Sequence, residues 1–174
     1  MILNKFIPKM YKKNIYDINY DLLKKQGIKL ILFDLDNTLT PAREEKFYKK
    51  TKELFDNLKK DFKVAIFSNN FKNRVSKYGE YYDVDLEYLS LKPMCFKYMK
   101  IKKKYGLKSN EIATVGDQLL TDIFGANNMK MYSILITPVS KIDLRETWLN
   151  RKIEGQIFKR LEKKNILKKG KYYE

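Results

Sequence analysis

The sequence predicts an α/β fold of three layers, in which a five-stranded parallel sheet is covered by helices on both faces. Two observations support this prediction: short, almost wholly apolar segments recur along the chain, and segments with apolar residues at helical spacing alternate with them. Strands that are apolar on both faces are typical of a parallel sheet buried between helices. Because no internal repeat or low-complexity linker interrupts this alternation, we expect a single domain over residues 1–174.

Each expected strand is a short segment rich in β-branched, Leu or Phe residues; the five segments are residues 29–36, 63–70, 86–91, 111–117 and 131–138. The first two contain the longest uninterrupted apolar runs of the chain, Leu30 to Phe33 and Val64 to Phe67. We therefore expect both to be buried.

The expected helices lie between these strands; they are residues 44–60, residues 71–82, a segment from Pro93 to about Tyr105, and a short helix from about Thr121. In the first of them one helical face holds Phe47, Thr51, Leu54, Phe55 and Leu58. Proline is common at the first position of a helix, so Pro93 is expected to start the third.

The chain is basic, with a formal net charge of +16, and much of this charge lies at its ends. Residues 1–30 contain seven Lys or Arg and two acidic residues, and residues 141–174 contain eleven and five. We divide the domain into a core at 29–138, a basic N-terminal segment at 1–28 and a basic C-terminal segment at 141–174. Basic surfaces attract nucleic acid, anionic lipid headgroups or phosphorylated substrates. The C-terminal segment has helical spacing over residues 141–167, with candidate anchors at Trp148, Ile153, Ile157 and Leu161, although Gly155 weakens this prediction.

Composition excludes several classes of function. The chain has no histidine, which excludes Ser-His-Asp and Cys-His catalysis and any metal site built on imidazole. Its single cysteine, Cys95, cannot form an internal disulfide. No apolar run exceeds four residues, whereas a transmembrane helix needs about 20. We expect a cytoplasmic protein whose chemistry rests on carboxylates, lysines and hydroxyls.

Four aspartates follow strands of the predicted sheet and are expected to converge. Asp34 and Asp36 end the first expected strand, Asp117 ends the fourth, and Asp122 lies five residues further on. In open parallel sheets, ligands bind beyond the carboxyl ends of the strands. Carboxylates this close would raise one another's pKa unless a cation neutralised them. Magnesium suits oxygen ligands of this kind, so we predict that these four aspartates hold Mg²⁺.

Other polar residues at the same edge suit a phosphate group. Thr38, Ser68 and Asn69 supply hydroxyl, amide and backbone N–H groups at the ends of strands, and Lys92 supplies a positive charge. We expect these four residues to bind the substrate. One aspartate near the metal can attack phosphorus as a nucleophile, and a second can act as general acid and then general base.

These residues resemble the motifs of the haloacid dehalogenase (HAD) superfamily of phosphatases. The run DLDNT at 34–38 matches the first motif, Ser68 the second, Lys92 the third, and GDQLLTD at 116–122 the fourth. The resemblance implies a HAD-like Rossmannoid fold. It also implies that Asp122 completes the fourth motif near the metal.

The resemblance assigns roles to the other residues. Asp34 would be the nucleophile and Asp36 the acid/base, while Ser68 and Lys92 would hold the phosphoryl group. Asp117 would be a magnesium ligand alongside the Asp34 carboxylate and the Asp36 backbone carbonyl.

The spacing of the motifs leaves no room for a cap domain. Only 29 residues lie between Thr38 and Ser68, and only 23 between Ser68 and Lys92. Members of the superfamily that act on small metabolites usually insert a cap at one of these points. The site should therefore be open, which suits a large substrate or one whose bulk stays in another phase.

The details resemble the YqeG-type phosphatases of subclass IIIA, which are related to the mitochondrial phosphatidylglycerophosphate phosphatases. The matching runs are GIKLILFDLDNTL, FSNN, KP, GDQLLTDIFGANN and, near the N-terminus, FIP. The related enzymes remove the terminal phosphate of phosphatidylglycerophosphate to give phosphatidylglycerol. An anionic lipid fits an uncapped, basic protein, so we expect a magnesium-dependent phosphatidylglycerophosphate phosphatase of phospholipid synthesis.

Two other interpretations stay open. One is a HAD phosphatase for another phosphorylated substrate, either a metabolite or a nucleic-acid end. The other is a basic RNA- or ribosome-binding protein with an idle site, although the sequence contains no nucleic-acid recognition motif and keeps every key aspartate. The sequence does not predict the oligomeric state.

The N-terminal segment also has two interpretations. Six apolar residues at helical spacing would form a stripe among four lysines; they are Ile2, Leu3, Phe6, Ile7, Met10 and Tyr11. Such a stripe could lie in a membrane interface, drawn by anionic lipid, and would make the protein peripheral on the inner face of the membrane. Alternatively it packs on the domain's own core, because Pro8 breaks the helix.

Overall fold

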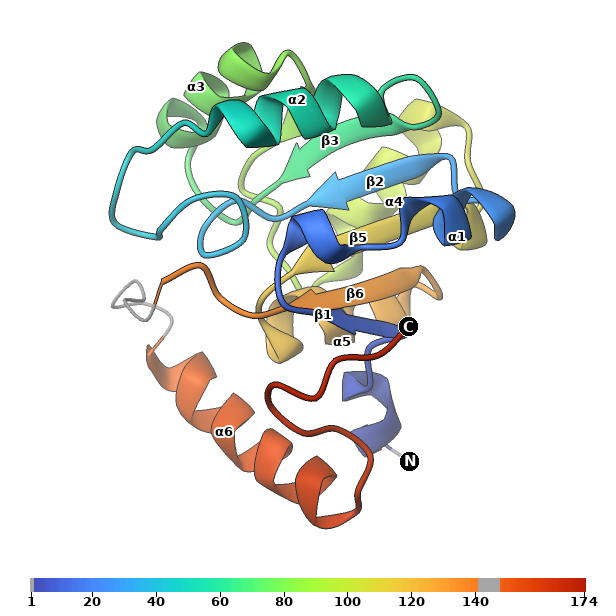
Figure 1. Ribbon diagram of the computed structural model, residues 1–174, viewed down its shortest axis with the longest axis vertical. Coiled ribbons are helices and arrows are strands. Elements are labelled where there is room, and N and C mark those ends of the chain that lie inside the picture. Colours follow the sequence, from blue (N-terminus) through green and yellow to red (C-terminus); the bar gives the residue numbers. More distant parts are fainter. Residues whose placement is uncertain (1, 141–147) are drawn as a thin grey trace.

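The computed structural model describes residues 2–140 and 148–174 (Figure 1). The chain is organised around a sheet of parallel strands. Within these residues one parallel sheet has the strand order β1-β6-β5-β2-β3-β4. The six strands are β1 (Met10–Lys12), β2 (Leu30–Phe33), β3 (Lys63–Phe67), β4 (Asp85–Glu87), β5 (Ile112–Gly116) and β6 (Tyr132–Ile136). The five predicted strands are all present and each is shorter than predicted, so the α/β class is confirmed.

The sixth strand, β1, lies in the segment that the sequence assigned to a helical stripe. It pairs with β6 at the sheet edge, with Met10 opposite Ile134. Before it, Ile2–Phe6 forms a short 3-10 helix, η1. Phe6, Met10 and Tyr11 are buried. The continuous helical stripe is therefore wrong, and these side chains pack on the domain's own core instead of facing a membrane.

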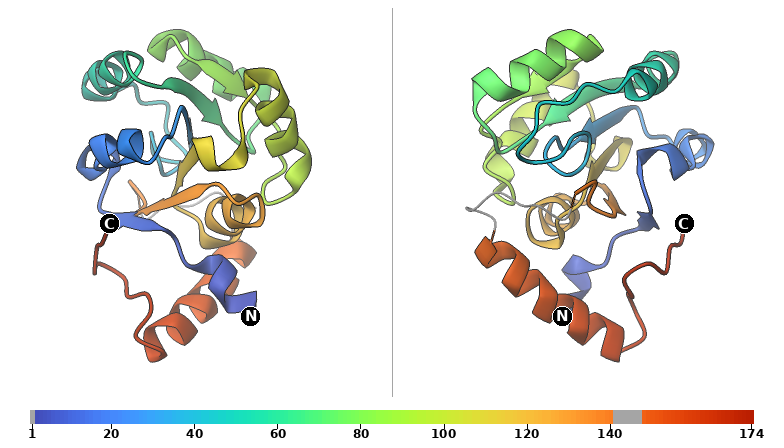
Figure 2. Two further views of the ribbon diagram at one scale, coloured as in Figure 1. Left: turned by 90° about the vertical axis from the view of Figure 1, so that its right-hand side faces the viewer. Right: turned by 60° about the vertical axis from the view of Figure 1, so that its left-hand side comes forward.

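Helices cover both faces of the sheet, as Figure 2 (left) shows. One face packs against α1 (Tyr20–Lys25), α2 (Lys49–Leu58) and α3 (Lys72–Tyr82), and the other against α4 (Cys95–Tyr105), α5 (Phe124–Asn128) and α6 (Trp148–Lys163). Alternation along β2 explains the two interfaces, because Ile31 and Phe33 face the first set of helices while Leu30 and Leu32 face the second.

The connections near the site differ from the prediction in small ways. Helix α4 begins at Cys95 instead of Pro93, and it ends at Tyr105 as expected, with Gly106 in the left-handed region at φ 65°. The expected helix near Thr121 begins as a π-helical turn, η4 (Leu119–Ile123), which leads into α5. Between β2 and α4 the chain carries α2, β3, α3 and β4 and no inserted domain, so the uncapped architecture is also confirmed.

The C-terminal helix α6 packs against the side of the sheet that carries η1 and η4. Ile157 and Leu161 are buried as expected, whereas Ile153 is exposed and does not anchor the helix. Residues 141–147 and the side chain of Trp148 lie outside the described residues. Beyond α6 the chain returns to β1, where the Tyr173 N–H donates to the Tyr11 carbonyl at 2.9 Å. In the described part of the chain, no helix is long and apolar enough to cross a membrane.

Candidate active site at the carboxyl edge of the sheet

A cavity of about 420 Å³ opens where β2, β3 and β5 end. It is lined by Asp34, Asp36, Ser68, Asn69, Asn70, Phe71, Lys92, Gln118, Thr121, Asp122 and Asn150. These residues come from four loops at one sheet edge and from the start of α6, as parallel pairing requires. Six of the eight predicted site residues are among them; Thr38 and Asp117 are not.

Lys92 lies at the centre of the acidic residues. Its Nζ donates to Asp34 Oδ1 at 2.5 Å and to Asp122 Oδ1 at 2.7 Å. All three side chains are largely buried. Burial lowers the pKa of Lys92, but the Asp122 and Asp34 carboxylates outweigh this effect, and the pKa lies above its ordinary value. Lys92 is therefore a fixed positive charge at the place where a phosphoryl group would meet Asp34.

Three carboxylates converge around this lysine. Oxygen atoms of Asp34, Asp117 and Asp122 all lie within 4.8 Å of one another. Burial raises the pKa of Asp34 to about 7, Lys92 opposes the rise, and the carboxylates of Asp122 and Asp36 add to it. Burial also raises the pKa of Asp117 well above its ordinary value, against the effect of Arg151. Lys92 and Arg151 together do not balance three carboxylates, and the oxygen atoms of these carboxylates are the donor set that a hard divalent cation takes. The residues present thus fit a divalent metal ion.

A glycine allows Asp122 to reach this position. A Cβ atom on Gly116 would lie 2.2 Å from Asp122 Cγ, so no other residue fits at the end of β5 without displacing the carboxylate. The Gln118 N–H then donates to Asp122 Oδ2 at 3.1 Å. This close approach is the physical reason for glycine at the start of GDQLLTD.

The Asp36 side chain lies apart from the three converging carboxylates. Arg74 donates to its Oδ1 from Nε at 3.0 Å and from Nη2 at 2.8 Å, and Asn70 Nδ2 donates to Oδ2 at 2.9 Å. The carboxylate of Asp36 is therefore not among the three clustered carboxylates that could hold a metal ion, which leaves only its backbone carbonyl for the predicted metal contact. It lines the cavity, in a position fixed by two residues of the loop and helix that follow β3.

Two predicted substrate-binding residues have structural contacts. Thr38 is buried and does not line the cavity, and its Oγ1 donates to Asp117 Oδ1 at 3.5 Å; its substrate contact stays a prediction. Asn69 lines the cavity, but its Oδ1 accepts from Ser90 Oγ and from the Lys92 N–H, both at 2.7 Å. Its Nδ2 donates to the Lys92 carbonyl at 3.1 Å. The Asn69 side chain therefore holds the loop that carries Lys92.

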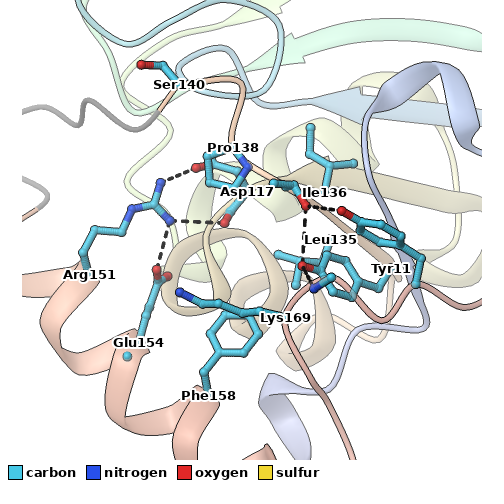
Figure 3. A pocket seen from close by; sticks show the side chains of 14 residues that line it. Tyr11, Asp117, Leu135, Ile136, Pro138, Ser140, Arg151, Glu154, Phe158 and Lys169 are labelled. Atoms are coloured by element: carbon cyan, nitrogen blue, oxygen red, sulfur yellow. Dashed lines mark hydrogen bonds and ion pairs between the residues drawn. The ribbon is translucent and has the colours of Figure 1, made fainter.

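The C-terminal helix contacts Asp117 beside a second cavity of about 490 Å³ (Figure 3). Arg151 Nη2 pairs with Asp117 Oδ2, and Nη1 donates to the Asp117 carbonyl at 3.2 Å and to Glu154 Oε2 at 3.1 Å. Glu154 Oε1 in turn accepts from the Leu120 N–H at 2.8 Å. Arg151 thus pairs with Oδ2 of Asp117. Of the hydrogen bonds described above, the other carboxylate oxygen, Oδ1, accepts only the long one from Thr38.

A family model described as mitochondrial PGP phosphatase matches residues 2–140 of this chain. The chain belongs to this family. The probable phosphatase YqeG of Bacillus subtilis (strain 168) is 34% identical over 165 residues, which cover 94% of this chain and 96% of that protein. Phosphatidylglycerophosphate phosphatase 1, chloroplastic/mitochondrial, of Arabidopsis thaliana is 25% identical over 92% of this chain, which spans 49% of that protein.

Solved structures show the same fold at low identity. The cobalt-bound deoxy-D-mannose-octulosonate 8-phosphate phosphatase of Haemophilus influenzae gives a TM-score of 0.51 at 16% identity, over 80% of this chain and 92% of its own. A haloacid dehalogenase-like family hydrolase of Xanthomonas campestris gives 0.52 at 13% identity, over 76% and 98%. The matched family and the YqeG relative identify the chain as a phosphatase, an enzyme that hydrolyses phosphoric monoesters, and these structures show that it has the HAD-type fold.

Sequence reasoning missed three residues that contact the aspartates of this phosphatase, Asn70, Arg74 and Arg151, and it missed Glu154, which contacts Arg151. Asn70 had a signal, because it belongs to the SNN run after the second strand. Arg74 follows on the first turn of α3, where a long side chain reaches the same edge. Nothing local to α6 indicated that its first turns pack on Asp117.

We predict that Arg151→Met weakens magnesium binding by about 10-fold or more at neutral pH, because outer partners of metal ligands typically have effects of this size. Arg151 favours the charged form of Asp117, so its loss raises the pKa of Asp117 further and lets a proton compete with the metal. The deficit should shrink as pH rises. Calorimetric titration of Mg²⁺ at two pH values measures both effects.

Arg160→Met is the matched control, because Arg160 is an exposed arginine in the last turn of the same helix. It should leave magnesium affinity unchanged. Equal affinities for Arg151→Met and Arg160→Met would contradict the role given to Arg151.

Proposed function

We propose that this phosphatase removes the terminal phosphate of phosphatidylglycerophosphate, with Mg²⁺, through an aspartyl-phosphate on Asp34. The observation that carries the proposal is the uncapped cavity, in which the buried Asp34–Lys92 pair lies within reach of a bulky substrate. The matched family and the name of the Arabidopsis relative support phosphatidylglycerophosphate as the substrate. The basic surface of the chain, with a net charge of +16, suits an anionic lipid.

Asp34 is the nucleophile in this proposal. One of its carboxylate oxygens attacks phosphorus while the bond from phosphorus to the glycerol oxygen breaks. Lys92, which already contacts Asp34 Oδ1, and the Ser68 hydroxyl hold the oxygens of the transferring group. Mg²⁺ on Asp34, Asp117, Asp122 and the Asp36 carbonyl would supply further neutralisation of the phosphate charge.

Asp36 transfers the protons. It gives one to the departing glycerol oxygen, and then accepts one from the water that attacks the aspartyl-phosphate and releases inorganic phosphate. Arg74 and Asn70 fix the Asp36 carboxylate at the cavity wall, which suits its role as the charged base of the second step. Hydrolysis of the aspartyl-phosphate restores the free Asp34 carboxylate. The catalytic cycle therefore needs no group other than these residues, water and the metal.

An uncapped site leaves the cavity open to a substrate that stays anchored in a membrane. Caps in this superfamily close over small metabolites, whereas the chain on both sides of Ser68 carries only α2, β3, α3 and β4 here. A diacyl lipid can keep its acyl chains in the bilayer while its terminal phosphate enters the cavity. The proposal therefore places the protein peripherally at the inner face of a membrane.

The substrate proposal predicts a clear preference. The value of kcat/KM for phosphatidylglycerophosphate in mixed micelles should exceed that for a 5′-phosphorylated oligonucleotide, a sugar phosphate and an aryl phosphate by about 100-fold or more, because the lipid alone matches both headgroup and phase. Phosphate release under identical magnesium concentrations measures each value. Phosphatidic acid is the control, since it presents a phosphomonoester in the same micelle without the terminal glycerol. A faster reaction with the oligonucleotide or the sugar phosphate would contradict the proposed substrate.

A further inference from the structure

Large apolar side chains are exposed around the active-site cavity. We call this set the apolar rim; it consists of Phe71, Leu91, Met94, Phe96 and Leu149, which are 70%, 53%, 52%, 59% and 58% exposed. Single exposed apolar residues are ordinary on protein surfaces, but a group gathered at one site marks an interaction surface.

Three separate segments bring the rim residues to the cavity. Phe71 lines the cavity directly, and Leu91 and Leu149 are the chain neighbours of Lys92 and Asn150, which also line it. Met94 and Phe96 follow at the start of α4. In Figure 1 the arrowheads of β2 and β3 point to the side of the molecule on which α6 begins. The exposed apolar groups thus lie on, or directly beside, the segments that form the opening through which substrate reaches Asp34.

The identity of the occupant follows from what the rim surrounds. A protein docked on the rim would cover the catalytic opening, whereas a lipid surface that carries the substrate would supply it. The charges agree, because the exposed Lys72 and Lys152 lie beside the rim segments and the whole chain is strongly basic. In the N-terminal segment, Phe6, Met10 and Tyr11 are buried and cannot make this contact.

We propose that the apolar rim inserts into the interface of an anionic phospholipid bilayer and sets the cavity against the headgroups. This inference rests on the proposed lipid substrate, and it names the surface of the enzyme that meets the membrane. Partly inserted aromatic and aliphatic side chains with lysines beside them are the combination that binds such interfaces.

The test uses the full chain with Phe96→Gln and Leu149→Gln combined, two rim residues that do not line the cavity. Sedimentation with vesicles of equal parts phosphatidylcholine and phosphatidylglycerol measures binding. The double variant should bind about 10-fold or more weakly than the natural chain, because two apolar insertions are lost. Hydrolysis of a soluble aryl phosphate should stay unchanged, while hydrolysis of vesicle-embedded phosphatidylglycerophosphate should fall with binding.

Ile166→Gln is the matched control, because Ile166 is 39% exposed and lies beyond the carboxyl end of α6, away from the rim. It should bind vesicles as the natural chain does. Equal binding by the double variant, or no vesicle binding by the natural chain, overturns the proposal. A natural chain that dimerises in solution, with a double variant that is monomeric, also overturns it and assigns the rim to a protein contact. Rim-dependent binding without phosphatidylglycerophosphate hydrolysis supports the surface and contradicts the substrate alone.

Discussion

Asp34→Asn is expected to lower phosphatase turnover by about 10⁴-fold or more, because the amide cannot form the aspartyl-phosphate and effects of this size follow the loss of a nucleophile. The fold should survive, since Asn has the same shape and Lys92 keeps its bond to Asp122 at 2.7 Å. Phosphate release from an aryl phosphate in excess magnesium measures the activity, and circular dichroism checks the fold. Near-normal magnesium-dependent turnover in this variant would show that Asp34 is not the nucleophile.

The same variant has a predicted effect on stability. Burial raises the pKa of Asp34 from its ordinary value of 3.8 to about 7 in the fold, so the unfolded chain binds fewer protons between these two values. The contribution of Asp34 to the stability of the metal-free protein therefore falls as pH rises through this range. Asp34→Asn removes the penalty. Its melting temperature in EDTA at neutral pH should equal or exceed that of the natural chain.

Lys92→Met is expected to have the largest effect on stability. It leaves Asp34 and Asp122 buried and facing each other without their shared cation, and removing one partner of a buried ion pair typically costs about 3–5 kcal/mol. Turnover should also be lost, because no other charge replaces Lys92 beside the phosphoryl group. Urea unfolding in EDTA measures the loss of stability, and added Mg²⁺ should restore part of it by neutralising the carboxylates.

Lys97→Met is the matched control for this experiment. Lys97 lies on α4, close to Lys92 in the chain, and pairs with Glu87 at 2.5 Å, but its side chain is 25% exposed. Solvent screens such a pair, so its loss should cost only about 1 kcal/mol or less. If the Lys92 variant lost no more stability than the Lys97 variant, Lys92 could not be the cation that holds the buried carboxylates together.

The four longer strands, β2, β3, β5 and β6, could be predicted because each is largely apolar and buried over several consecutive residues. β4 was predicted with longer bounds than its three residues, which are not fully buried. β1 could not be predicted, because it lies in a segment with helical spacing and is defined by its pairing with β6, far away in the sequence. Apolar residues at helical spacing in the N-terminal segment fitted a membrane face and a core face equally well. Only the burial of Phe6, Met10 and Tyr11 decides between these two interpretations.

The convergence of Asp34, Ser68, Lys92 and Asp122 could be predicted because parallel strands end at one edge of the sheet. The bend before Thr38 could not be predicted: Asn37 adopts a left-handed conformation, with φ 61°, and ends the extended run from β2. Thr38 consequently lies beneath Asp117 and outside the cavity.

The contacts made by α6 and the apolar rim arise only when distant segments meet. Arg151 reaches Asp117 across 34 positions of the chain. The rim combines residues that follow β3, residues that follow β4 and the first turn of α6. No local sequence pattern predicts contacts between segments this far apart in the chain. Each motif at the end of a strand, in contrast, spans only a few consecutive residues and can be recognised locally.

The most direct test of the account is phosphate release from phosphatidylglycerophosphate in mixed micelles, measured for the natural chain with magnesium, with EDTA, and for Asp34→Asn with magnesium. We predict rapid release only by the natural chain with magnesium. Equal release in EDTA or by Asp34→Asn would contradict the proposed mechanism. No release from the lipid, alongside magnesium-dependent turnover of an aryl phosphate, would contradict the proposed substrate.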